Sequence, residues 1–208
     1  MAPTTRVRRP PDQARRAILD AAEALLADGG VAAVQVRAIA ARVGMTDAGI
    51  NHHFGTRDRL LEALLRHGGR KIRDGLQEVT RAWLDHGTDI DELVDALAGF
   101  YRRGYGELGI ALHAAGWRDE GSGMLDPVVD ALHAARPDAD DVPVEDTRLA
   151  VAALHQALAT DPLYGSAFRR SAGITGRSAT SPTAQLRWWA TYLTRSLGLH
   201  HRPRSPRG

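Results

Sequence analysis

VRAIAARVGMTDAGINHHF, residues 36–54, has the pattern of two short helices joined by a tight turn. Ala40 is small enough for a close helix crossing, and Gly44 accepts the positive φ that a short turn requires. Ile50 is an apolar anchor that faces back from the second helix. Each feature is common in helical proteins, but here the three occur together and in register. The stretch therefore predicts a helix-turn-helix, a unit that places its second helix in the major groove of DNA.

The rest of the chain follows helical periodicity, and no segment alternates like a strand. We predict a first helix from Asp12 to about Ala27 that stops at Gly29-Gly30, because glycines end helices readily. Further helices are expected at 36–43 and 47–53, from Thr56 towards Trp83, and at 90–105, 107–119, 127–136, 144–170 with a break near Asp161-Pro162, and 183–198. The predicted fold class is all-α.

Geometry assigns roles within the second helix of the motif. Ile50 and Phe54 are four residues apart and point inward. A rotation of about 100° per residue puts Ala48 and His52 on the opposite face, with Gly49 and Asn51 on its flanks. Asn51 can pair bidentately with adenine, or it is simply solvated. Thr46 is placed to cap this helix, and Thr56 to cap the next one.

The segment RRAILDAAEALLADGGVAAVQVRAIAARVGMTDAGINHHFGTRDRLLEALL, residues 15–65, resembles the amino-terminal DNA-binding domain of the tetracycline-repressor (TetR) family of bacterial transcription regulators. The matching elements are an amphipathic helix, a Gly-Gly break, the helix-turn-helix, and the exit HHFGTRDRLLEAL into a fourth helix. The resemblance covers about a quarter of the chain. Residues 81–208 show no recognisable family pattern.

The resemblance implies a domain layout and a set of DNA contacts. We expect a basic disordered arm at 1–11, a helix-turn-helix domain at 12–56, a helical regulatory and dimerisation domain at 57–199 that opens with a connecting helix at 57–80, and a disordered tail at 200–208. His53, Arg57 and Arg37 lie where family members typically touch phosphate. The expected DNA-binding residues are Arg37, Thr46, Asp47, Ala48, Gly49, Asn51, His52, His53 and Arg57.

The second helix of the motif departs from the family's usual residues at several positions. Asp47 stands where a basic contact is frequent and would repel phosphate, although it can accept from a cytosine amine or favour the helix start. Asn51 and His53 replace two aromatic residues. Gly49 costs roughly 1 kcal/mol relative to Ala in a helix, and close approach of the backbone to DNA is one possible compensation. The operator sequence of relatives therefore does not carry over.

Composition limits the function classes. The 208 residues carry a net charge of +2 and no cysteine, which excludes disulfides and thiolate metal sites. The first sixteen residues hold five arginines against Asp12 alone, an arm that either lies along DNA or is a solvated tail. No apolar run is long enough for a bilayer and the start lacks an apolar signal core, so we expect a cytoplasmic protein without membrane partners.

Catalytic and metal motifs are missing from the sequence. There is no Gly-rich phosphate loop, HExxH, cysteine nucleophile or GxSxG, so no enzyme activity and no cofactor are expected. His52 and His53 are a poor metal pair, because adjacent helical residues diverge by about 100°. No metal site is predicted.

The segment TAQLRWWATYLTRSLGL, residues 183–199, has two apolar stripes. Leu186, Trp189, Ala190, Leu193 and Leu197 form the first stripe, and Trp188 with Tyr192 forms the second. So wide an apolar surface indicates either a subunit interface or a buried helix. The family resemblance implies an interface in a four-helix bundle, formed by Leu186, Trp189, Leu193 and Leu197. A homodimer would also present two recognition helices to a two-fold operator.

Several aromatic residues and histidines lie on the helices between the two ends. They either surround a cavity for a small organic effector or form an ordinary core: Trp83, Phe100, Tyr101, Tyr105, His113, Trp117 and His133. Gly68-Gly69 in the fourth helix forms a soft joint, or allows close packing against the first helix, or ends the fourth helix early.

These observations favour one function over two others. We expect a homodimeric, ligand-responsive repressor that binds an inverted-repeat operator in double-stranded DNA and is released by an unidentified small organic effector. The alternative is a DNA-binding regulator controlled by protein contacts alone. An enzyme is the least favoured class.

Overall fold

The computed structural model describes residues 10–121 and 123–199, and every regular element in these two ranges is helical. The elements are α1 Pro11–Ala33, α2 Val36–Val43, α3 Asp47–Phe54, α4 Arg57–His86, α5 Ile90–Phe100, the π-helical turn η1 Tyr101–Tyr105, α6 Gly106–Ala114, α7 Asp126–Ala134, α8 Val144–Thr160, the π-helical turn η2 Asp161–Gly165, α9 Ser166–Ser171, α10 Gly176–Thr180 and α11 Thr183–Ser196. The all-α prediction is confirmed. Residues 1–9 of the basic arm predicted at 1–11, and the tail predicted at 200–208, lie outside the described residues.

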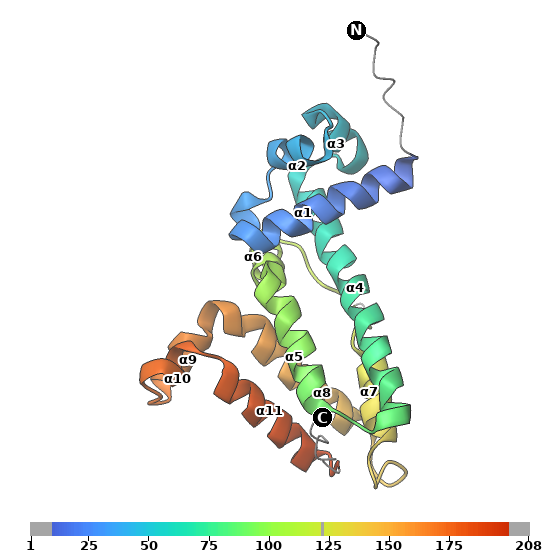
Figure 1. Cartoon of the computed structure of the whole chain (residues 1–208), viewed down its shortest axis with the longest axis vertical. Helices are drawn as coiled ribbons and strands as arrows, with labels where there is room; N and C mark the ends of the chain where they lie inside the picture. Colours follow the sequence, from blue (N-terminus) through green and yellow to red (C-terminus); the bar gives the residue numbers. More distant parts are fainter. Residues whose placement is uncertain (1–9, 122, 200–208) are drawn as a thin grey trace, which may run out of the picture.

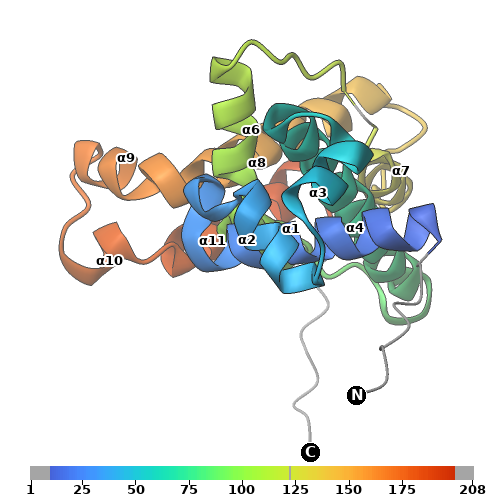
Figure 2. The same ribbon diagram turned by 90° about the horizontal axis from the view of Figure 1, so that it is seen from above.

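Helices α1–α3 gather at one end of the molecule, and the long α4 leads from them into the body (Figure 1). In the body, α5 packs against both α4 and α11, and α7 contacts α4 and α8. Viewed from above, α9 and α10 lie at one side of the molecule and α7 at the other (Figure 2). No helix in the described ranges is long and apolar enough to cross a membrane.

The predicted helix ends agree with the structure where glycine or a cap sets them. The backbone of α1 leaves helical geometry at Gly29 (φ −148°) and Gly30 (φ 66°), as expected, although one more turn follows before Ala33. The bounds of α2 are as predicted, and α3 is one residue longer. The 144–170 helix breaks at Asp161, where η2 begins, while the 107–119 helix ends early, at Ala114.

One apolar core runs through both ends of the molecule. Ile18, Ile39, Ile50 and Leu64 fill its upper part and are completely buried. It continues into the body through Leu76, Leu93, Leu97, Leu108, Leu132, Leu154 and Leu193. Since the two parts share this core, the helix-turn-helix is held firmly on the body.

Gly68 and Gly69 lie within the uninterrupted α4. A Cβ atom on Gly68 would lie 2.1 Å from Cε1 of Tyr105, whereas one on Gly69 would meet only Sδ of Met124 at 3.8 Å. Gly68 is therefore needed for close packing, but it packs against η1 and not against α1 as predicted. The predicted early end of the helix at this pair is wrong.

Candidate nucleic-acid interface

The turn between α2 and α3 has the geometry that the sequence predicted. Gly44 adopts a left-handed conformation (φ 67°, ψ 37°), and its N–H donates to the carbonyl of Ala40. Ala40 is buried at the helix crossing, and Ile50 and Phe54 point into the core beneath α3. These contacts fix the angle at which α3 leaves the turn.

The outward face of α3 carries polar and small side chains. Ala48, Asn51 and His52 are exposed, as is Asp47 in the first turn. The Thr46 hydroxyl accepts a hydrogen bond from the Gly49 N–H at 3.1 Å, so the predicted cap is present. These exposed groups form a surface that can face base edges in a major groove.

Gly49 has a local packing role. A Cβ atom there would lie 3.2 Å from Cε of Met45 and 3.3 Å from Oγ1 of Thr46. Such spacing is tighter than most side-chain contacts, so a larger residue would disturb the cap. The capped first turn leaves little room for a side chain at this position, and glycine fits there because it has none.

Arg57 does not extend from the surface as predicted. Its Nε donates to the Val34 carbonyl at 2.9 Å and its Nη2 to the Val31 carbonyl at 2.8 Å. Val31 lies in the last turn of α1, where its carbonyl also accepts from the Val34 N–H at 3.2 Å, and Val34 directly follows the helix. The guanidinium is half-buried and ties α4 to α1, so the assignment of Arg57 to phosphate contact is corrected to a structural role.

The remaining basic side chains near α3 differ in their exposure and in the groups they contact. Arg37 is exposed at the start of α2, as a phosphate contact requires. The guanidinium of Arg15 lies 4.3 Å from the ring centre of Phe54 and donates to the His53 carbonyl. Burial, with the charges of His52 and Arg15, lowers the pKa of half-buried His53. His53 is therefore predominantly neutral at pH 7.

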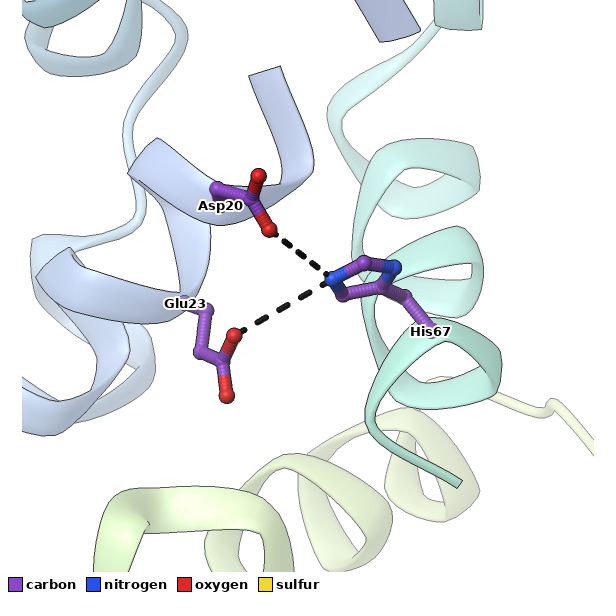
Figure 3. Close-up of side chains that lie close together, drawn as sticks. All are labelled: Asp20, Glu23 and His67. Atoms are coloured by element: carbon purple, nitrogen blue, oxygen red, sulfur yellow. Dashed lines mark hydrogen bonds and ion pairs between the residues drawn. The ribbon is translucent and has the colours of Figure 1, made fainter. Parts of the chain in front are cut away.

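A buried carboxylate connects this unit to the body. Glu23 of α1 is 6% exposed, and its two oxygens accept from Nζ of Lys71 at 2.5 Å and from Nη2 of Arg103. Nearby, Nε2 of His67 lies 3.2 Å from Oδ1 of Asp20 (Figure 3). Burial raises the pKa of Glu23. The hydrogen bond and charge of Lys71 and the charge of Arg103 together lower the pKa by more than burial raises it, so the net shift is downward. The carboxylate is thus ionised and joins α1, α4 and η1.

Sequence reasoning did not find this group. The Asp20–Glu23 spacing of three residues places both carboxylates on one face of α1, which was visible in the sequence. Their partners His67 and Arg103 are 47 and 80 residues away. Only the packing of α1 against α4 and η1 brings them together.

Most of the predicted pocket residues are core residues. Phe100 and Tyr105 stack with their ring centres 4.3 Å apart, and Trp83 is also buried. The Tyr101 hydroxyl lies 2.6 Å from Nδ1 of His155, and burial raises the pKa of Tyr101 and lowers that of His155. These side chains fill space between the helices.

The other three predicted pocket residues lie at the edge of the fold. His113 is exposed, so its assignment to a pocket lining is wrong. Trp117 is half-buried against the core, and Nδ1 of His133 lies 3.1 Å from the Thr147 hydroxyl. A cavity of about 260 Å³ lies elsewhere, at η2, with a lining that includes Gln156, Thr160, Asp161, Phe168 and Gln185. None of the seven predicted residues lines it.

The two stripes of α11 have opposite surroundings. Leu193 and Leu197 are buried within the chain itself, where α11 packs on α5, and Leu186 and Trp189 are half-buried beside them. Burial in one chain contradicts the assignment of Leu193 and Leu197 to contact with a second subunit. Trp188 and Tyr192 are 56% and 48% exposed, and their rings stack with centres 5.1 Å apart.

A capped, exposed α3 held by α2 over a shared core defines a helix-turn-helix protein with a helical body. Residues 18–64 match the family described as bacterial regulatory proteins, tetR family. The match lies in the amino-terminal part of the chain, where the sequence resembles this family. The matched relatives are named transcriptional regulators, the function class that the sequence favours over an enzyme.

The curated relatives resemble the chain in its amino-terminal part. The chain is 43% identical over 61 residues to the HTH-type transcriptional repressor Rv3405c of Mycobacterium tuberculosis and to the HTH-type transcriptional regulator Mb3439c of Mycobacterium bovis. The match covers 29% of this chain and spans only 32% of each relative.

Solved structures match the fold over nearly the whole chain. A putative transcriptional regulator from Rhodococcus sp. RHA1 is 12% identical with a TM-score of 0.51, over 90% of this chain and 96% of that one. The multidrug binding protein EbrR, complexed with imidazole, is 21% identical with a TM-score of 0.50, over 91% and 98%. At these identities the likeness concerns the fold alone.

Proposed function

We propose that the protein is a transcriptional repressor that binds an inverted-repeat operator as a homodimer and is released by a small organic effector. The observation that carries the DNA-binding part is the outward face of α3. Its exposed residues have no role in the core, while the residues between them anchor the helix. A recognition helix requires one face that reaches DNA and another that anchors the helix in the core.

The proposed DNA contacts fall into two groups. Asn51 and His52 face the base edges, with Ala48 giving a close approach, and Asp47 reads a cytosine amine from the helix start. Arg37 contacts phosphate and His53 offers a neutral hydrogen bond at the helix end. Thr46 and Gly49 act through the cap of α3.

The base contacts can be tested after operator selection. Genomic fragments that the protein retains are sequenced, and an inverted repeat with half-sites at least one helical turn apart is expected. Asn51→Ala should then reduce discrimination at one base pair by about 1–3 kcal/mol. Ser178→Ala, which removes an exposed hydroxyl on α10, is the control and should leave DNA binding unchanged. Equal losses on operator and random DNA for Asn51→Ala would contradict base readout by this residue.

The dimer rests on the exposed aromatic pair of α11. Trp188 and Tyr192 hold a flat, stacked surface in solvent, and Leu149 of α8 is 69% exposed. Aromatic residues of this kind are enriched at the centre of protein interfaces. Two copies that cover these residues would also present two recognition helices to one operator.

Assembly can be measured by light scattering. The double variant Trp188→Arg/Tyr192→Arg should keep its helical circular dichroism, because both side chains are half-exposed, but should become monomeric and lose tight operator binding. Ile174→Arg alters an exposed apolar residue in the loop before α10 and is the control. A dimer that persists in the double variant would place the interface on another surface.

Release by an effector is supported by the cavity at η2. The cavity combines Phe168 with the polar groups of Gln156, Asp161 and Gln185, a lining that suits a small hydrogen-bonding organic molecule. Compounds that raise the melting temperature should be titrated against the protein–operator complex. Release of DNA supports the effector, whereas regulation that needs a second protein would favour the alternative mechanism.

A further inference from the structure

Asp20, Glu23 and His67 form a cluster in which three potential metal ligands converge (Figure 3). Nε2 of His67 is 3.2 Å from Oδ1 of Asp20 and 4.0 Å from Oε2 of Glu23. All three donor atoms lie within 4.8 Å of one another. Zn²⁺ holds imidazole and carboxylate ligands at about 2.0–2.2 Å, which places ligand atoms of one ion roughly 3.0–3.5 Å apart. Only a small movement of the Glu23 side chain is needed to reach that spacing.

The ligand types and their exposure suit a transition metal. One imidazole and two carboxylates favour Zn²⁺ over the all-oxygen sites that Ca²⁺ and Mg²⁺ prefer. The side chains of Glu23 and His67 are 8% and 13% exposed, whereas that of Asp20 is 61% exposed. The cluster thus has two well-fixed ligands, and its open side at Asp20 admits an ion and leaves a position for water.

Lys71 is the cation that an incoming metal ion meets. Its Nζ binds the same Glu23 oxygen that faces His67, at 2.5 Å, while Arg103 binds the other oxygen. The side chain of Lys71 is 49% exposed, so its ammonium can move into water on a flexible stem. Arg103 can stay in place. Exchange of the ammonium for a divalent ion keeps the Glu23 carboxylate paired throughout.

We propose that Asp20, Glu23 and His67 form a Zn²⁺ site in which the metal ion displaces the ammonium group of Lys71. The ion links α1 to α4, next to the point where the helix-turn-helix joins the body. Zn²⁺ therefore stabilises the contact between these two helices in place of the Lys71–Glu23 ion pair.

The test uses the full chain, freed of metal by a chelator, titrated with Zn²⁺ alone by calorimetry at pH 7. One Zn²⁺ per chain is expected, together with a rise in melting temperature. His67→Gln and Asp20→Asn should each weaken binding at least tenfold, and His113→Gln, an exposed histidine on α6, should not. Circular dichroism checks that each variant is folded.

Lys71→Met separates this site from a purely structural ion-pair cluster. Removal of the competing ammonium should tighten Zn²⁺ binding several-fold, although the same change breaks an ion pair with Glu23. With bound Co²⁺ as a probe, the visible absorption should disappear in His67→Gln. Binding that is unchanged in both ligand variants, or that is not tightened in Lys71→Met, overturns the proposal. So does binding that depends instead on the paired histidines His200 and His201.

Discussion

Replacement of Gly68 or Gly69 by alanine tests how α4 is fixed to the body. The two residues are neighbours in one uninterrupted helix, but only Gly68 faces the ring of Tyr105. A Cβ atom on Gly68 would lie 2.1 Å from Cε1 and 2.3 Å from Cζ of that ring. Tyr105 is 2% exposed and stacks on Phe100, so its ring cannot move aside without disturbing the core.

The pair of variants isolates the steric cost. Alanine in place of glycine favours a helix by about 1 kcal/mol at either position, so this gain cancels between the two variants. Overpacking of a filled core costs about 1–3 kcal/mol. Gly68→Ala should therefore be less stable than Gly69→Ala by about 1–3 kcal/mol, which corresponds to a melting temperature lower by about 2–12 °C for a chain of this length.

Thermal and urea unfolding, followed by circular dichroism, measure the difference. Gly69→Ala should equal or exceed the wild type in stability, since its Cβ meets only Met124 at an ordinary distance. If the glycines instead form a soft joint, both variants stiffen α4 and should behave alike. Equal stabilities of the two variants would therefore refute the packing argument.

Two further predictions concern Arg57 and His155. Arg57→Ala should lower the free energy of unfolding by about 1.5–3 kcal/mol, because hydrogen bonds from a charged group are lost, yet leave the salt dependence of DNA binding unchanged. Arg37→Ala should do the opposite, with a flatter salt slope and unchanged unfolding. For His155, burial lowers the pKa below the ordinary 6.5. Stability should thus be full above pH 6.5 and fall as the pH drops through the lowered pKa, and His155→Gln should remove this part of the decline in urea unfolding measured across pH.

The helix-turn-helix could be predicted from the sequence because its determinants are local. Gly44 sets the turn, Thr46 caps the next helix, and Ile50 with Phe54 follows the helical period. Each of these depends on residues within one or two turns of itself. Local rules therefore placed α2 and α3 to within one residue and identified the exposed face of α3.

Arg57 shows where local rules stop. Its position after a recognition helix is equally compatible with a phosphate contact and with a bond to another helix. The choice depends on Val31 and Val34, whose carbonyls lie within reach of the guanidinium at the end of α1. The partners of Glu23 are hidden for the same reason, because they come from helices far along the chain.

The two stripes of α11 show that helical periodicity identifies an apolar face but does not identify what that face packs against. Leu193 belongs to an aliphatic stripe with a small residue, Ala190, and such a stripe packs closely against a neighbouring helix such as α5. Trp188 and Tyr192 carry polar groups on large rings, which suits a surface that is exposed in one chain and covered in a complex. A charge at Leu193 would therefore unfold the subunit, whereas a charge at Trp188 tests its assembly. The distinction follows from burial in a single chain and decides which variants can measure dimerisation.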